Sequence, residues 1–523
     1  HEISLVQKHP PNGEASRKPK AQIIRMDTKK MNKSHNGTSV PNYCFDISGI
    51  IDFISNGGGY TGIQRVVVMV ASSFYDAVPD DHKDRVYIGY YDRLSDSYRC
   101  MPFAQIKDYI KYPNLLSEAL SVRAKKSTGS IQVDIFLKKY RKKSLKYYFH
   151  LWRLDILSLL GKDAHFLKFN TNSSGWKRLR RGQEEMRGKT ISKISSVNST
   201  NILKAGDVLF LLDAAWHSSH IEKITKISSM GIKTITMVHD LIPLKMTCYT
   251  DPSIPGAYVN WIMRSAEYSS AYLAVSNNTL SDLKYFMRSI SADKNIHLLP
   301  LAQGFVKPKD RSSTIGALAE KVSSDMYPDF HEVINAHPSL RIYKGIPFIL
   351  CVGTIEIRKN PMRLLQAWKQ LIDRSLGDVP KLVFAGRMGW LIDDFRHALE
   401  ASGNLNGYID IIEQPSDDDL SFLYRNCLFT VMPSIYEGWG LPVGESLSFG
   451  KTAVVSNTSS LPEVGKDLVE YCNPMSVSDI ADAVWRLISE PERRIYLEKK
   501  IAKAPLRGWE AVGNDLFMIA HKM

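Results

Sequence analysis

The sequence VMPSIYEGWGLPVGESLSFG, residues 431–450, decides the fold class. An apolar segment ends at Pro433 and Ser434, glycines interrupt the stretch at Gly438 and Gly440, and apolar residues then recur at helical spacing. This is the order of a strand, a loop and the start of a helix. The same alternation recurs along most of the chain, which predicts α/β domains with parallel sheets that bind ligands at the carboxyl ends of their strands.

Two glutamates flank the glycines of this loop. Glu437 precedes them and Glu445 follows eight positions later, and either residue is compatible with an ordinary solvated surface position. Between the glutamates, the backbone amides of Gly440, Leu441 and Val443 are expected to be unpaired at the start of the helix, where phosphate binds readily. Such amides, with a carboxylate on each side, suit a diphosphate that joins two polyhydroxylated rings, as in a nucleotide sugar.

The string Glu-Gly-x-Gly-Leu-Pro-x-x-Glu at residues 437–445 resembles the glutamate-x7-glutamate signature of the retaining glycosyltransferases of family 4. The resemblance extends over nearly all of residues 44–520, apart from a basic insert and a linker. It implies the GT-B fold, in which two doubly wound, Rossmann-like α/β domains face each other across a cleft. It also implies transfer of a hexose from a nucleotide diphosphate donor with retention at the anomeric carbon.

The expected domain organisation follows from this resemblance and from shifts in composition. It comprises a disordered arm at 1–42, an N-terminal Rossmann-like acceptor domain at 43–305 with a basic insert at about 103–200, a linker at 306–345, a C-terminal Rossmann-like nucleotide-sugar-binding domain at 346–505, and a helix at 506–523 that crosses back to the N-terminal domain.

A glycine-rich loop stands near the start of the N-terminal domain. It follows an expected strand, YCFDISGIIDF at 43–53, and precedes an expected helix, IQRVVVMVASSF at 63–74. The spacing is not GxGxxG, so a dinucleotide-binding fingerprint is not supported. In family 4 the corresponding loop lies against the diphosphate of the donor. The resemblance therefore implies substrate-binding roles for Gly58, Gly59 and Gly62.

Two further strand ends carry polar residues in the same domain. The string TITMVHDLIPL, residues 234–244, predicts a strand that ends at His239 and Asp240. A lone histidine is more often structural, but VHDLIPL resembles the family motif in which the histidine contacts the donor sugar near its 6-hydroxyl. The string AVSNNTLSDL resembles another family segment, which implies that Ser276 ends a strand facing the cleft.

The C-terminal domain opens with PFILCVGTIEIRKN, residues 347–360, a strand followed by a basic loop. Lys359 stands where the family has the lysine that contacts the diphosphate. Thr354 replaces the arginine that commonly follows the glycine, and the resemblance suggests Arg358 as the second cation. Both cations could instead be solvated surface residues.

The resemblance implies a complete set of site residues. Glu437 would hold the 3- and 4-hydroxyls of the sugar, and Glu445 would accept hydrogen bonds from the ribose. The implied catalytic residues are His239, Glu437, Arg358 and Lys359, and the implied substrate-binding residues are Gly58, Gly59, Gly62, Asp240, Ser276, Gly386, Arg387, Gly438, Gly440, Leu441 and Glu445. The three aspartates at 417–419 are expected to cap a helix, so we expect no cofactor and no metal.

Positive charge is concentrated in one segment. The chain has a formal net charge of +14, and residues 121–181 hold 16 Lys and Arg against three Asp, a net +13. Within them, 137–161 predict a basic amphipathic helix whose apolar face holds Tyr147, Leu151, Leu154 and Leu157. The helix could cover the domain as an ordinary solvated element or lie on anionic lipid. Nucleic acid is not an expected partner, because no nucleic-acid-binding motif accompanies the charge.

Composition also bears on compartment. The sequence contains neither 18 consecutive apolar residues nor an opening signal peptide, and its six cysteines show no metal-binding or paired spacing. We expect a cytoplasmic protein that is peripheral at the inner face of the cell membrane.

The strings GTIExRKN and EGWGLP narrow the expected reaction. They resemble bacterial mannosyl- and rhamnosyltransferases of surface polysaccharide assembly, which implies GDP-mannose as donor and a lipid-linked saccharide or polysaccharide as acceptor. The alternatives are dTDP-rhamnose or a UDP-hexose as donor, a nucleotide-sugar 2-epimerase of the same fold, or a non-enzymatic basic scaffold that binds membrane or RNA.

Overall fold

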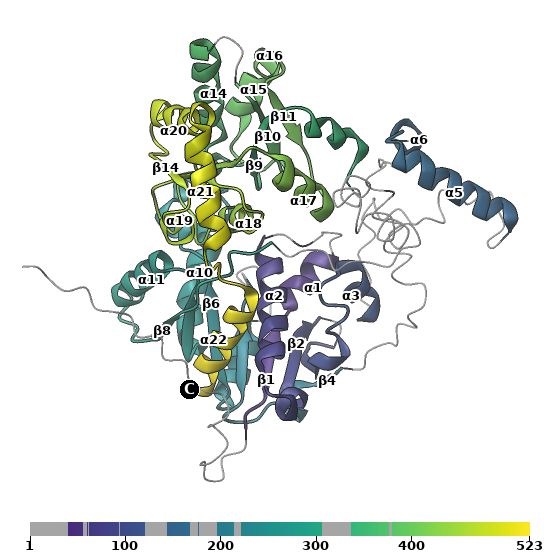
Figure 1. Ribbon diagram of the computed structural model, residues 1–523. Helices are drawn as coiled ribbons and strands as arrows, with labels where there is room; N and C mark the ends of the chain where they lie inside the picture. The colour runs from purple at the N-terminus through teal and green to yellow at the C-terminus, as the bar shows by residue number, and fades with distance from the viewer. Residues whose placement is uncertain are drawn as a thin grey trace, which may run out of the picture. The chain divides into compact units, whose positions relative to one another are not determined.

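The computed structural model describes most of the chain (Figure 1). The described residues are 40–55, 60, 62–93, 95–120, 144–167, 176, 196–213, 221–305, 336–375 and 379–523. The expected disordered arm, the glycines Gly58 and Gly59, and most of the expected linker lie outside the described residues. The predicted domain bounds remain predictions, and below we call residues 40–305 the first half and residues 336–505 the second half.

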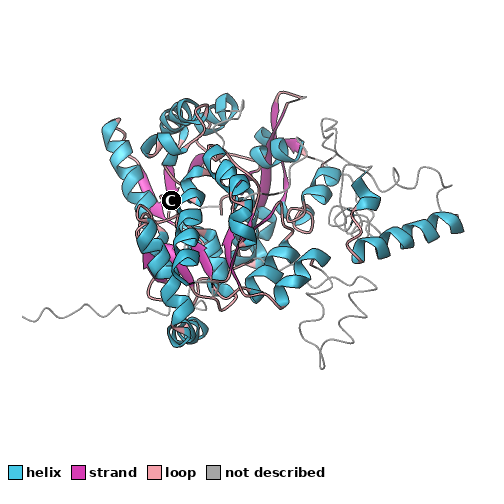
Figure 2. Cartoon of the chain, turned by 90° about the horizontal axis from the view of Figure 1, so that it is seen from above, coloured by secondary structure: helices cyan, strands magenta, loops and turns pink. Residues whose placement is uncertain are grey.

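The first half contains one eight-stranded sheet with the order β4-β3-β2-β1-β5-β6-β7-β8. Its strands are β1 (Tyr43–Asp46), β2 (Val86–Asp92), β3 (Ser97–Pro102), β4 (Val197–Asn198), β5 (Val208–Leu211), β6 (Lys233–Val238), β7 (Ala271–Ala274) and β8 (Asn295–Leu298). Strands β5 and β7 are buried at every position, because helices cover both faces of such a sheet (Figure 2). The helices of the first half are α1 (Ser48–Ser55), α2 (Gly62–Ala77), α3 (Pro113–Ala119), α5 (Leu145–Leu159), α6 (Ala164–Leu167), α8 (Ile221–Ser229), α9 (Ile242–Lys245), α10 (Ile254–Tyr268) and α11 (Asn277–Ser289).

Two expectations for the first half are wrong in detail. The strand expected at 43–53 ends at Asp46, whose carboxylate accepts a hydrogen bond from the Ser48 hydroxyl at 2.6 Å and so turns the chain. Ile50 and Ile54 are then buried four residues apart, the spacing of helix α1. The sheet is also not fully parallel, because β3 pairs antiparallel with both β2 and β4 at one edge.

The second half contains a six-stranded, fully parallel sheet with the order β11-β10-β9-β12-β13-β14. Its strands are β9 (Phe348–Val352), β10 (Lys381–Ala385), β11 (Ile409–Ile412), β12 (Thr430–Met432), β13 (Ala453–Ser456) and β14 (Glu470–Cys472). The helices are α14 (Pro361–Ser375), α15 (Asp393–Ala401), α16 (Gly403–Gly407), α17 (Asp417–Asn426), α18 (Leu441–Ser448), α19 (Leu461–Gly465), α20 (Val477–Ser489) and α21 (Pro491–Lys503). Because β9 and β12 are neighbours, the loops that follow them lie next to each other.

The last helix, α22 (Trp509–His521), packs on α2 of the first half. A Cβ added to Gly513 would lie 2.2 Å from the carbonyl oxygen of Ser73, so the two helices approach closely at this glycine. The ring of Phe517 lies 5.9 Å from that of Phe74 and 6.3 Å from that of Tyr43. Residues near the end of the chain therefore complete the core around β1.

Candidate functional site

The central stretch folds as the sequence predicts. Strand β12 leads into a buried loop at 433–440, and α18 begins at Leu441. Gly440 has φ of 103°, a conformation that favours glycine, and a Cβ there would also lie 2.6 Å from Leu461. The glycine therefore turns the chain from the loop into the helix where a larger residue would not fit.

The predicted anion-binding site at the start of α18 has fewer unpaired backbone amides than expected. The amide of Val443 is paired, because it donates to the carbonyl oxygen of Gly440 at 3.0 Å. The amides of Gly440 and Leu441 have no hydrogen-bond partner among the described residues. Two backbone donors thus remain for an anion at this position, and Val443 is not one of them.

Glu437 lies between the two predicted cations. Its carboxylate oxygens are 2.8 Å from Nη1 of Arg358 and 2.5 Å from Nζ of Lys359, and all three side chains are largely buried. The cations follow β9 and the glutamate follows β12, so the neighbouring loops bring them together. Burial alone would raise the pKa of Glu437, but the charges of Arg358 and Lys359 outweigh it and lower this pKa to about 2. Glu437 is therefore ionised at neutral pH.

Arg358 has more partners than Lys359. Its guanidinium also donates to the carboxylate of Glu356, which is buried, and to the carbonyl oxygen of Tyr436 at 2.5 Å. Burial would lower the pKa of Arg358, but the two glutamates raise it. Arg358 is thus held on several sides, whereas the ammonium group of Lys359 bonds only Glu437 among the described residues.

His239 is a residue of the first half that lies beside the loop of Glu437. It follows β6, and its Nε2 lies 2.8 Å from the carbonyl oxygen of Leu212. A carbonyl only accepts, so Nε2 carries the proton of the neutral ring and Nδ1 is an acceptor. Burial lowers the pKa of His239, which favours that neutral ring. A Cβ at Gly438 would lie 2.1 Å from the carbonyl oxygen of His239, so the loops of the two halves touch here.

Asp240 and Glu445 are two further carboxylates of the site. Burial raises the pKa of Asp240, whose carboxylate accepts from the amide of Ile242 at 3.0 Å, and Arg358 offsets part of that rise. Burial likewise raises the pKa of Glu445, which accepts from the Tyr424 hydroxyl at 2.8 Å through Oε2. The other carboxylate oxygen of Glu445 has no partner among the described residues.

Sequence reasoning missed two residues whose side chains connect the halves near the site, and the first is Arg65. Arg65 of α2 pairs with Asp417 at the start of α17, and the positive charge of Arg65 lowers the pKa of Glu445 against the effect of burial. Arg65 lies in the helix expected at 63–74, but nothing in the sequence pointed to its partner.

Tyr436 is the other missed residue, directly before Glu437. Its hydroxyl accepts from Nδ2 of Asn278 at 2.7 Å and from Nζ of Lys245 at 3.1 Å, and it donates to Asp282. These three partners all belong to the first half. Tyr436 therefore ties the loop of Glu437 to that half.

Other expected residues have structural explanations. Ser276 is fully buried and caps α11, because its hydroxyl accepts from the amide of Thr279 at 3.0 Å, and its expected substrate contact stays a prediction. Gly386 permits a close approach of β10 to β9, since a Cβ there would lie 1.9 Å from the carbonyl oxygen of Gly353. Arg387 is exposed beside this turn, and Gly62 opens α2, where an added Cβ would meet no atom within 4 Å.

The three aspartates at 417–419 confirm the predicted cap. Ser416 and Asp419 form a reciprocal capping box at the start of α17. Among the described residues no cluster of His, Cys, Asp or Glu has the arrangement of a metal site. In the same part of the chain, no helix combines the length and hydrophobicity needed to cross a bilayer.

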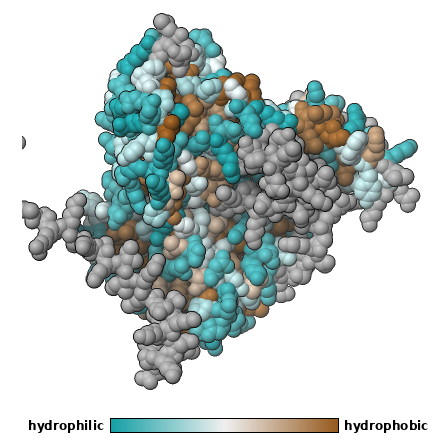
Figure 3. Space-filling view, viewed as in Figure 1, coloured by the Kyte–Doolittle hydropathy of each residue, from teal (hydrophilic) through white to brown (hydrophobic). Residues whose placement is uncertain are grey.

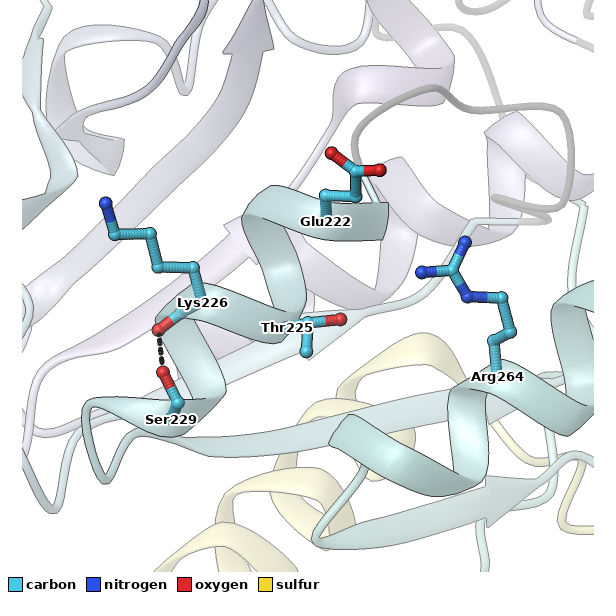
Figure 4. Close-up of a pocket in the computed structure, with 5 residues that line it drawn as sticks. All are labelled: Glu222, Thr225, Lys226, Ser229 and Arg264. Atoms are coloured by element: carbon cyan, nitrogen blue, oxygen red, sulfur yellow. Dashed lines mark hydrogen bonds between the residues drawn. The ribbon is translucent and has the colours of Figure 1, made fainter.

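A surface hollow of about 380 Å³ lies elsewhere, between α8 and α10 (Figure 4). It is lined by Glu222, Thr225, Lys226, Ser229 and Arg264. The Ser229 hydroxyl donates to the carbonyl oxygen of Lys226, and the Thr225 hydroxyl donates to the carbonyl oxygen of Ile221. Both hydroxyl protons are therefore engaged within α8. None of the predicted site residues lines this hollow.

Comparison with known proteins supports the assignment of the second half. Residues 333–504 match the family Glycosyl transferases group 1. O-antigen chain mannosyltransferase B of Escherichia coli is 35% identical over 164 residues, which cover 31% of this chain and 42% of that protein. Serotype-specific mannosyltransferase WbdA of Escherichia coli is 27% identical over 294 residues, which cover 54% of this chain and 34% of that protein. The chain thus spans less than half the length of these relatives.

A solved structure of HepE from Anabaena, in complex with UDP and glucose, aligns with a TM-score of 0.48 at 10% identity, over 92% of this chain and all of that chain. Within the chain itself, two doubly wound α/β sheets confirm the predicted GT-B class. Together with the family match, they lead to one conclusion about the second half: residues 333–504 are a glycosyl transferases group 1 domain.

Proposed function

We propose that this protein is a retaining glycosyltransferase that moves mannose from GDP-mannose to a hydroxyl of a lipid-linked saccharide or polysaccharide in bacterial surface glycan synthesis. The observation that carries the proposal is the contact of Glu437 with Lys359 and Arg358, beside the His239 loop of the other half. The mannosyltransferase names of the relatives support the choice of donor sugar and pathway.

Departure of the nucleoside diphosphate is the step that most needs stabilisation, because negative charge develops on the leaving oxygens. Lys359 is suited to it, since its ammonium group has a single carboxylate partner among the described residues. We propose that the donor diphosphate takes the place of Glu437 on Lys359, with the amides of Gly440 and Leu441 as further donors. Arg358 stays in place because Glu356 and the Tyr436 carbonyl hold it.

The exchange would also free Glu437 for the sugar. Its ionised carboxylate can then accept hydrogen bonds from the 3- and 4-hydroxyls, while Nδ1 of His239 accepts from the 6-hydroxyl. Glu445 has one carboxylate oxygen without a partner among the described residues, which suits the ribose hydroxyls of the nucleotide. Asp240 lies beside these groups and contributes a further acceptor.

The first test is a donor panel. The full chain is incubated with GDP-mannose, dTDP-rhamnose and UDP-hexoses, and nucleotide release is measured with and without a lipid-linked saccharide acceptor. Acceptor-dependent release from GDP-mannose with an α-linked product, seen by NMR, is expected. Acceptor-dependent release from another donor would show that the proposed donor sugar is wrong. Epimerised donor formed without acceptor would show that the protein is a 2-epimerase and not a transferase.

Two further measurements test the ribose contact of Glu445 and the expected independence from divalent metal ions. Glu445→Ala is expected to weaken donor binding in calorimetry, and an unchanged affinity would remove the ribose assignment. Because cations and backbone amides supply the positive charge, activity is expected to persist in EDTA. A complete loss in EDTA, restored by a divalent ion, would show that this part of the proposal is wrong.

A further inference from the structure

Helix α5 has two apolar faces, and the first is already packed. Tyr147 and Leu151 are buried against Phe166 and Trp176 in a small core. The indole of Trp176 also donates to the carboxylate of Asp155 on α5 at 2.8 Å. Of the two alternatives that the sequence left open for the face of Tyr147 and Leu151, packing on the protein is therefore the one observed.

The opposite face of α5 is apolar and exposed. Tyr148 is 42% exposed, Phe149 and Trp152 are each 59% exposed, and Leu160 just beyond the helix is 60% exposed. At 100° per residue these side chains fall within about a third of the helix circumference, and the rings of Phe149 and Trp152 lie 6.0 Å apart. Figure 3 shows hydrophobic residues gathered over this helix. An exposed aromatic group of this size marks an interaction surface.

Positive charge borders the exposed face. Lys146 and Arg153 are exposed at positions three before and four after Phe149, so they lie along one edge of the aromatic group. The segment 121–181 that contains α5 has a net charge of +13. Apolar aromatic side chains bordered by cations are complementary to an anionic lipid surface, where Trp and Tyr lie at headgroup depth and each nearby cation adds attraction.

We propose that the outer face of α5, formed by Tyr148, Phe149, Trp152 and Leu160, binds the surface of an anionic lipid bilayer. The helix lies in the plane of the membrane, because its 15 residues are too few to cross the hydrocarbon. The buried face stays packed on Phe166 and Trp176, so binding leaves the small core intact. This inference does not depend on the proposed transferase activity.

Sedimentation with vesicles tests the inference on the full chain. Vesicles of phosphatidylcholine alone are compared with vesicles that also contain phosphatidylglycerol, at low and high salt. Binding is expected only with the anionic lipid and is expected to weaken in high salt. The variant Phe149→Ser/Trp152→Ser is expected to bind at least about tenfold more weakly, and Lys146→Glu/Arg153→Glu to lose the preference for anionic lipid.

Tyr285→Ser is the matched control, because Tyr285 is a single exposed aromatic residue on α11, outside the aromatic group of α5, and the variant is expected to bind like the parent chain. Circular dichroism and unfolding temperature show whether each variant is folded. If none of the folded proteins binds vesicles, or the aromatic variant binds as the parent does, the inference is wrong. Self-association that is lost in the aromatic variant without lipid would assign the face to a second copy instead.

Discussion

Nη1 of Arg358 lies 2.8 Å from Oε2 of Glu437, although the two residues follow different strands of the second sheet. The same guanidinium contacts Glu356, so one buried cation serves two buried carboxylates. Removing one partner of a buried ion pair leaves the other charge uncompensated, which costs much more than the intact pair contributes. Arg358 is therefore important for the stability of the site as well as for its charge.

Arg358→Ala is expected to lower the free energy of unfolding by about 3–5 kcal/mol, because Glu356 loses the cation that it contacts and Glu437 keeps only Lys359. Urea denaturation followed by fluorescence measures the loss. The control is Arg374→Ala, which removes a pair with Asp482 at 2.7 Å on the surface, where ion pairs contribute little. Equal losses of unfolding free energy in the two variants would show that the buried ion pairs stabilise the protein no more than a surface pair does.

The stability contributed by Glu437 is expected to depend on pH. Its pKa is lowered from 4.5 to about 2 in the folded protein, so the folded state favours the ionised form. This contribution is present above pH 4.5 and is lost as pH falls from about 4.5 toward about 2. Unfolding of the parent chain and of Glu437→Gln should therefore differ most at neutral pH and converge as the pH is lowered through this range. A constant difference over the range would contradict the assigned pKa.

Glu445 is expected to behave in the opposite way. Burial raises its pKa in the folded protein, so its ionised form lowers stability at pH values above that pKa. Glu445→Gln keeps an acceptor for the Tyr424 hydroxyl and removes the charge. The variant is expected to unfold at the same or a higher temperature than the parent at pH 7, while the proposed ribose contact weakens. Marked destabilisation would show that the charge of Glu445 stabilises the fold.

Gly438→Ala is expected to reduce kcat/KM for glycosyl transfer by about a hundredfold, because a Cβ would lie 2.1 Å from the carbonyl oxygen of His239 and displace one loop from the other. Gly256→Ala on α10 is the control, since no atom lies within 4 Å of its added Cβ. That change is expected to leave activity unchanged. Full activity in Gly438→Ala would show that the loops need not touch during the reaction.

Tyr436→Phe is expected to lower stability by about 1–3 kcal/mol, because three polar side chains of the first half lose a shared partner. Hydrogen exchange at the start of α11 should become faster, since Asn278 and Asp282 lie there. Tyr285→Phe removes an exposed hydroxyl from the same helix and serves as the control. Unchanged exchange in Tyr436→Phe would mean that the tyrosine does not hold the halves together.

Local patterns were sufficient for most of the fold. The strand, loop and helix start at 431–450 lie where periodicity and glycines put them, and Ser416 with the following aspartates caps α17 as expected. The signals for these elements lie within a few residues of each other. The error at 43–53 has the same origin, since a short apolar run fits a strand or a helix and only the turn at Asp46 decides between them.

The pairing of side chains was not predictable in the same way. The resemblance named Glu437, Lys359 and Arg358, but the contacts of Arg65 with Asp417 and of Tyr436 with Asn278 join residues far apart in the chain. Such contacts depend on how two sheets pack, and no local spacing encodes them. The sequence likewise identified α5 as amphipathic but left open whether the face of Tyr147 and Leu151 packs on the protein or lies on lipid, because the packing of Trp176 that decides this has no periodic signal.

The packing of α22 on α2 has a consequence for folding during synthesis. Tyr43 and Phe74 are synthesised before the second half, but Phe517, which packs on both, is synthesised after it. At roughly 5–20 residues per second, translation from β8 to α22 takes on the order of ten to forty seconds. During that interval the aromatic side chains of the first half that pack on α22 lack this partner, so we expect the nascent first half to bind chaperones that shield apolar side chains until α22 is made.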